Sequence, residues 1–228
     1  DSVFDGTPIR ASDTCSIEGF TIIPNSDSLS ARTAEGIFSD HPIDINNCKI
    51  KNAYWGIVVF RYTFTISNVI LNNIIVGVYL SFHTPQEVGR LTNSNITVRR
   101  INGVPQWQPS AATWVDYGTF HIDRLTALNM NPLSEVGVTN STFLSEGSFV
   151  NSSITNFRST CIWASAKTNY QYRIENSVLN GYRYGVQMLG PNLKVYNTIL
   201  LNNRDAGIRI YDPYTGDYNL YYNNGKTG

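Results

Sequence analysis

Short segments of alternating apolar and polar residues recur along most of the chain. Ile43 and Ile45 are apolar with a polar residue between them, and the same spacing recurs at Phe64 and Ile66. Alternation with a period of two places one set of side chains on each face of a β-strand. The pattern therefore predicts an all-β chain of short strands, each with one buried face.

The strand segments belong to a longer repeat that is marked by asparagine and glycine. The stretch around Asn47 and Gly56 reappears around Asn68 and Gly77, and 68 − 47 gives a spacing of 21 residues. A further alternating strand follows each glycine. We therefore predict a solenoid of about nine coils with three short strands in each. The coil markers are Gly19, Asn47, Asn68, Asn95, Arg124, Asn151, Asn176, Asn197 and Asn219.

The asparagines among these markers predict a ladder of stacked amides. An asparagine amide has both a donor and an acceptor, so copies that lie about 4.8 Å apart can hydrogen-bond to one another. We expect these amides to point inward, away from solvent. The predicted ladder consists of Asn47, Asn68, Asn95, Asn151, Asn176, Asn197 and Asn219.

The repeat also decides between fold classes. A helical solenoid is excluded because the alternation runs at two residues rather than 3.6 and asparagine and glycine interrupt every unit. A β-sandwich explains short strands but not asparagines in register. The asparagine column and the glycine column, as at Gly56, Ile57 and Val59, resemble the right-handed parallel β-helix repeat of pectin-lyase-like proteins and phage tailspikes. The resemblance covers nearly the whole chain and implies one single-stranded right-handed parallel β-helix domain over residues 1–228.

The resemblance does not fix the activity, because that superfamily contains lyases, hydrolases, epimerases, adhesins and inert shafts. In pectate lyases and polygalacturonases, carboxylates cluster on the strand that follows the glycine or at its start. Here the outward residues of that strand are Val58, Tyr79, Gln187 and Arg209. The regular coils are therefore interpreted as scaffold.

Charge and composition argue against some classes of binding partner. The 17 basic and 17 acidic residues cancel without forming a run of one sign, which argues against a nucleic-acid partner. No apolar stretch is long enough for a membrane span. A surface rich in Asn, Ser, Thr and Tyr favours an extracellular, cell-surface or virion-surface protein. No cofactor is expected; calcium is an open alternative that no motif supports. The three cysteines are expected to be small buried side chains without metal-ligand spacing.

The longer coils carry insertions near residues 81–90, 104–119 and 133–147. Loops that leave the same edge of consecutive coils become neighbours and can wall a groove. Aromatic faces stack on sugar rings, and charged groups bind hydroxyls or carboxylates, so the groove is predicted to bind a polysaccharide or glycan. The alternative is that Trp107 and Trp114 only pack the loops onto the coils. The candidate binding residues are His83, Glu87, Arg90, Trp107, Trp114 and Tyr117.

The strand after the second insertion carries the candidate catalytic residues. Alternation points His121 and Asp123 outward, and Arg124 follows at a marker position. An imidazole, a carboxylate and a guanidinium can act as base, orienting group and charge neutraliser. Hydrolysis requires two carboxylates, and Asp116 is the nearby partner for Asp123.

Two functional hypotheses follow. In the first, the protein binds an extracellular polysaccharide and, if it is an enzyme, degrades it as a polysaccharide lyase or glycoside hydrolase. In the second, it is a non-catalytic structural or adhesive β-helix segment of a surface protein, tailspike or filament. The sequence given ends at Gly228, at the glycine that elsewhere introduces another strand. We therefore expect further chain or another subunit to cover that end.

Overall fold

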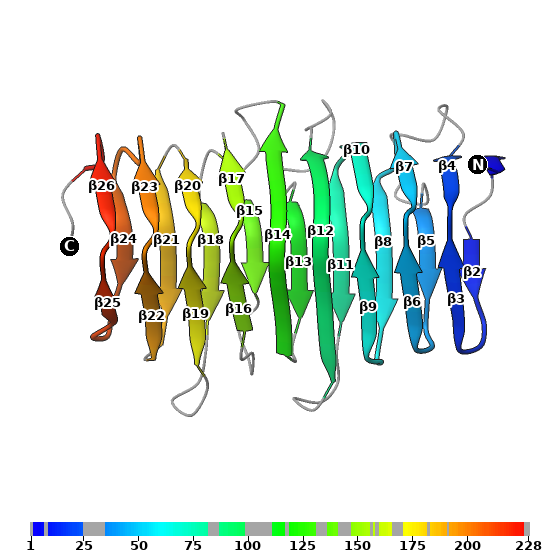
Figure 1. The fold of residues 1–228 in the computed structure, drawn as a ribbon, viewed down its shortest axis with the longest axis horizontal. Coiled ribbons are helices and arrows are strands. Elements are labelled where there is room, and N and C mark those ends of the chain that lie inside the picture. The colour runs from blue at the N-terminus through cyan, green and yellow to red at the C-terminus, as the bar shows by residue number, and fades with distance from the viewer. Residues whose placement is uncertain are drawn as a thin grey trace.

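The chain folds into a parallel β-solenoid, which confirms the predicted all-β fold class. The computed structural model describes residues 2–6, 9–24, 35–81, 87–98, 111–116, 119–130, 136–140, 147–155, 157, 160–165, 171–181, 183–190 and 192–225. All regular elements of these residues are strands. They lie side by side along the long axis, from β2 (Ile9–Ala11) near one end to β26 (Leu220–Tyr222) at the other (Figure 1).

One wall of the solenoid is a sheet of nine parallel strands. Each strand pairs with the equivalent strand of the next coil, as expected for a stacked repeat. In stacking order the strands are β2, β5 (Glu35–Ser39), β8 (Trp55–Phe60), β11 (Val76–Ser81), β13 (Ala111–Asp116), β15 (Val136–Asn140), β18 (Thr160–Ser165), β21 (Tyr184–Leu189) and β24 (Ala206–Ile210).

The other wall is a 17-stranded sheet with two arms that meet at the marker residues. The first arm contains β3 (Cys15–Glu18), β6 (Ile43–Asn46), β9 (Phe64–Ser67), β16 (Gly147–Val150), β19 (Tyr172–Glu175), β22 (Leu193–Tyr196) and β25 (Thr215–Asp217). The second contains β1 (Ser2–Gly6), β4 (Phe20–Pro24), β7 (Lys49–Lys51), β10 (Ile70–Ile74), β17 (Ser153–Thr155), β20 (Val178–Asn180), β23 (Ile199–Leu201) and β26. β12 (Val88–Val98) and β14 (Thr119–Asn129) run through both arms.

One detail of the predicted organisation changes: the solenoid has about six turns rather than the predicted nine. The strands β13 and β15 fall within two of the ranges predicted as insertions.

The core lies between the two sheets and runs the length of the solenoid. Residues four and two positions before each marker, such as Ile43 and Ile45, are 2% and 1% exposed. On the facing sheet, Ile57 and Val59 are fully buried. Each buried side chain stacks on its counterpart in the next coil, so apolar surface is removed from water along a continuous column.

The glycine column, which includes Gly56 and Gly77, permits close contact between the backbones of neighbouring coils. A Cβ atom added to Gly56 would lie 2.4 Å from the carbonyl oxygen of Gly77, and one added to Gly77 would lie 2.4 Å from the carbonyl oxygen of Ala112. Since real Cβ atoms do not approach so closely, the glycine column serves backbone packing.

The marker asparagines do not form a buried ladder, and that prediction was wrong. Asn47, Asn68, Asn151, Asn176 and Asn197 are exposed and have φ between 47° and 54°. This left-handed conformation reverses the side-chain alternation of the preceding strand. Asparagine tolerates it better than most residues because its short polar side chain can hydrogen-bond locally. The column is therefore selected for its backbone conformation.

The exposed amides still bond between coils. Asn68 Nδ2 donates to Asn46 Oδ1 at 2.9 Å, and Asn197 Nδ2 donates to Asn176 Oδ1 at 2.7 Å. Hydrogen bonds at the surface replace bonds to water, so each contributes little to stability. These contacts align the turns without supplying the buried network that was predicted.

Two predicted ladder residues lie outside the left-handed position. Asn95 pairs with Ile70 on the second arm, and Asn93 has the positive φ of 47° in that coil. In the last coil Tyr218 has φ 56°, and Asn219 is the next residue. The error arises because, in each of these two coils, the predicted asparagine lies one or two residues after the residue that has the positive φ.

In several coils the residue directly after the left-handed one is polar and points inward, whereas Val69 and Leu125 are buried apolar residues at that position. Ser152 Oγ donates to the Val150 carbonyl at 2.6 Å and accepts from the Leu125 N–H of the preceding coil at 2.9 Å. Thr198 N–H donates to Asn219 Oδ1 at 3.0 Å in the same way. Buried hydroxyls therefore satisfy the backbone at this turn. The other buried members are Ser94 and Ser177.

A second inward column contains a true amide ladder. Asn203 is fully buried, and its Nδ2 donates to Asn224 Oδ1 at 2.8 Å. Its Oδ1 accepts from the Gly181 N–H at 3.1 Å. Buried amides thus link three consecutive coils near β20, β23 and β26.

We expect Asn68→Gly to leave the thermal midpoint nearly unchanged and Asn68→Leu to cost about 1–2 kcal/mol of unfolding free energy, because leucine is strained at positive φ. Thermal denaturation followed by circular dichroism measures both variants. Equal losses in the two variants would contradict the conformational explanation and restore a role for the amide.

The three cysteines are free thiols, and two of them are buried as predicted. Cys48 and Cys161 are 1% and 0% exposed, and burial raises the pKa of each thiol above its ordinary value. Both are therefore poor nucleophiles. Cys15 is only half-buried.

Candidate functional site

The outer face of the nine-stranded sheet carries a row of large side chains. Register places Phe38 of β5, Val58 of β8, Tyr79 of β11 and Trp114 of β13 at equivalent positions in consecutive coils. Strands in a sheet lie about 4.8 Å apart, so these side chains follow one another closely along the solenoid. Trp163 of β18 occupies the same row two strands beyond Trp114.

Four rings of this face form what we call the outer aromatic cluster: Tyr54, Trp55, Tyr79 and Trp114. The Tyr79 ring centroid lies 5.1 Å from that of Trp55 and 5.6 Å from that of Trp114. Tyr54 is 2% exposed and belongs to a hydrophobic cluster separate from the main core. Trp55, Tyr79 and Trp114 are half-buried, which leaves part of each ring accessible.

This geometry revises both interpretations of Trp114. The residue lies on β13 and not on a loop, and its ring packs against rings from the two preceding coils. The planes of Tyr79 and Trp114 are inclined by 76°, an edge-on contact typical of aromatic packing. Packing and partial exposure therefore coexist at this residue.

The other predicted binding residues do not all gather here. Arg90 is exposed on β12 in the 17-stranded sheet, whereas Trp114 belongs to the nine-stranded sheet. Glu87 is half-buried, and its carbonyl oxygen accepts from the Thr119 N–H at 3.1 Å. Asp116 ends β13 opposite Ser81. His83, Trp107 and Tyr117 lie outside the described residues.

A charged pair lies at the N-terminal end of the row. The Arg10 guanidinium carbon is 5.1 Å from the Phe38 ring centroid, and Arg10 Nη2 is 3.3 Å from Glu35 Oε2. Burial raises the pKa of the Glu35 carboxyl, and the charge of Arg10 partly opposes that rise. The outer face thus combines rings with polar groups at its end.

The three catalytic candidates on β14 point outward, toward solvent, as half-buried or exposed side chains. His121 Nδ1 lies 2.9 Å from Ser148 Oγ of the next coil. Asp123 is bound on both sides: its Oδ2 is 3.1 Å from Arg124 Nε, and its Oδ1 accepts from Asn151 Nδ2 at 2.8 Å.

The contact between His121 and Ser148 could serve nucleophilic catalysis, because a hydroxyl nucleophile needs a base such as imidazole within hydrogen-bond reach. Asp123 is committed to Arg124 and Asn151, and it lies on a different sheet from Asp116. The predicted carboxylate pair is therefore divided between two sheets.

The described residues contain no group of three or more His, Cys, Asp or Glu side chains arranged to hold a metal ion. Within those same ranges there is also no helix long and apolar enough to span a membrane.

No protein-family model matches the chain, and no curated protein sequence matches it significantly. The chain is therefore characterised by its fold and by the surfaces just described.

Sequence reasoning missed Trp55 and Tyr79 as site residues. Tyr79 was assigned to the scaffold because it is one of the outward residues of the strand after the glycine, where carboxylates were sought and not found, and Trp55 precedes the glycine column. The available signal for Tyr79 was its outward position in the coil directly before that of Trp114; Trp55 lies one coil earlier, at the position equivalent to Val76.

Proposed function

We propose that the protein binds a polysaccharide or glycan on the outer face of the nine-stranded sheet, outside the cell or on a cell or virion surface. The supporting observation is the outer aromatic cluster, with Trp55, Tyr79 and Trp114 each partly accessible. Accessible indole and phenol rings suit the apolar faces of sugar rings, while their polar edges suit the hydroxyls.

A linear chain fits this surface because the solenoid repeats along one axis. The partly accessible rings of Phe38, Tyr79, Trp114 and Trp163 lie in one row along that axis. A polymer lying along that row would contact several coils at once, and weak contacts would add to a useful affinity. We assign the chain to a pectin-lyase-like β-helix on the same proposal, supported by its asparagine and glycine columns.

If the protein also cleaves a polysaccharide, the proposed place is β14, which lies in the 17-stranded sheet and not on the binding face. His121 would act as the base, with Ser148 in contact at 2.9 Å. Arg124 would neutralise charge on the substrate. The second candidate function is a non-catalytic structural or adhesive segment, and the ion pair between Arg124 and Asp123 favours it because both groups already have partners.

Trp114→Ala is expected to weaken glycan binding by roughly 30-fold, the loss of about 2 kcal/mol that is typical of a central aromatic contact. Affinity electrophoresis over a panel of polysaccharides identifies the ligand and measures the change. Release of reducing ends and absorbance of unsaturated uronates, followed on the same panel, report cleavage.

The matched control is Tyr211→Ala, which removes an aromatic ring that is 64% exposed just beyond β24. It should leave both binding and far-ultraviolet dichroism unchanged. Binding by the native protein to no member of the panel, or equal binding by the Trp114 and Tyr211 variants, would refute the proposal. Unfolding of the Trp114 variant would be seen in the dichroism, in which case Trp114→Phe replaces it.

A further inference from the structure

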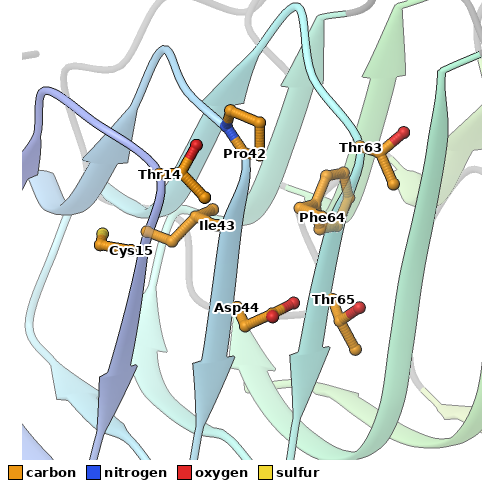
Figure 2. A pocket seen from close by; sticks show the side chains of 8 residues that line it. All are labelled: Thr14, Cys15, Pro42, Ile43, Asp44, Thr63, Phe64 and Thr65. Atoms are coloured by element: carbon orange, nitrogen blue, oxygen red, sulfur yellow. The ribbon is translucent and has the colours of Figure 1, made fainter.

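A cavity of about 230 Å³ lies where β3, β6 and β9 begin, at the edge of the 17-stranded sheet (Figure 2). Pro42 is a half-buried apolar residue of its lining, whereas Ile43 and Phe64, each 2% exposed, contribute little surface to it. The volume is below the range of about 300–1,000 Å³ that drug-sized ligands occupy. The cavity therefore suits a small molecule or a single unit of a chain.

Polar groups surround the apolar part of the cavity. Thr14, Thr63 and Thr65 line it with hydroxyl groups. Thr63 Oγ1 accepts from the Val88 N–H at 3.3 Å, which leaves its own proton to donate. Hydroxyls can both donate and accept, so this lining matches a ligand that carries several hydroxyls of its own.

Asp44 supplies the one charged group of the lining. Its side chain is exposed, and within the described residues it makes no hydrogen bond or ion pair. A carboxylate without a protein partner can bind a cationic amine through a charge-assisted hydrogen bond. The adjoining residues add a flat surface: His41 and Tyr62 stack with centroids 5.7 Å apart and planes 10° apart.

We propose that this cavity binds an amino sugar, with the protonated amine on Asp44 and the sugar hydroxyls on the threonines. The site goes beyond the proposed function, since it lies on the other sheet from the outer aromatic cluster and shares no residue with it.

Cys15 makes the site testable, because it is a half-buried residue of the cavity lining. Cys48 and Cys161 are 1% and 0% exposed, so a thiol reagent should modify one cysteine in the native protein. Glucosamine near neutral pH is expected to slow the reaction of Cys15 with Ellman's reagent in a saturable way. Glucose, which lacks the amine, should need about tenfold higher concentration for the same effect.

Asp44→Asn should raise the apparent Kd for glucosamine by about tenfold, with each rate normalised to that of the same variant without sugar. Asp212→Asn, far along the solenoid from the cavity, is the control and should behave as the native protein. No protection by glucosamine, equal protection by glucose, or unchanged protection in the Asp44 variant would each overturn the proposal. Trp114→Ala should leave the protection intact, which separates this site from the polysaccharide surface.

Discussion

Gly89→Ala is expected to lower the free energy of unfolding by about 3 kcal/mol, at the upper end of the cost of overpacking a core. Gly89 lies in an inward column between Phe64 of the preceding coil and Phe120 of the next. An added Cβ would lie 2.3 Å from Phe64 Cζ and 3.0 Å from Phe120 Cδ2. The ring centroids of the two phenylalanines are only 6.3 Å apart, so neither ring can yield without moving the other.

A double-mutant cycle tests that explanation. Phe64→Leu removes the ring atom that the new methyl group would strike, so Gly89→Ala should cost less in that background than in the native chain. Urea denaturation of the four proteins measures the coupling. Strict additivity of the two losses would show that the methyl group disrupts the coil by another route.

The core columns could be predicted from the sequence because they depend only on local alternation. Ile43, Ile45, Ile57 and Val59 were identified by a period of two, and all are buried. The sequence did not predict that a large residue in one coil, such as Phe64, lies against a small residue in the next, such as Gly89. Their matching depends on which coil lies next to which, and the variable coil length hides that register.

The direction of the asparagine side chains could not be read from alternation. A period of two assumes extended backbone throughout, and it fails at Asn47 and Asn68, where φ is 53° and 54°. A positive φ turns the chain and brings the following residue inward instead. Frequent serine and threonine after these asparagines, as at Ser152 and Ser177, was the available signal for the buried polar column.

The candidate site was predicted in part. The outward direction of His121 and Asp123 followed from the strand pattern and agrees with their accessibility. The contact between His121 and Ser148 did not follow, since it joins residues 27 positions apart. Trp55 and Tyr79 were likewise missed as neighbours of Trp114, because strand register brings them together across three coils.

Asn203→Leu is expected to cost about 3 kcal/mol of unfolding free energy, because it removes a buried amide from a satisfied network. The Asn203 side chain is fully buried and serves three coils. Its Nδ2 donates to the Leu179 carbonyl at 3.4 Å and to Asn224 Oδ1 at 2.8 Å, and its Oδ1 accepts from Gly181 at 3.1 Å. Leucine has a similar volume but satisfies none of these groups.

The adjacent Asn202 provides the matched control, because it is exposed and has φ 53°. Asn202→Gly keeps the favoured conformation and should cost about 1 kcal/mol or less. Thermal and urea denaturation of both variants compare a buried amide with an exposed one at neighbouring positions. If the Asn203 variant lost no more stability than the Asn202 variant, the buried amides would not contribute to coil stacking. A large loss confined to Asn203 would assign the stabilising role to the inward column, one residue beyond the asparagines that dominate the sequence pattern.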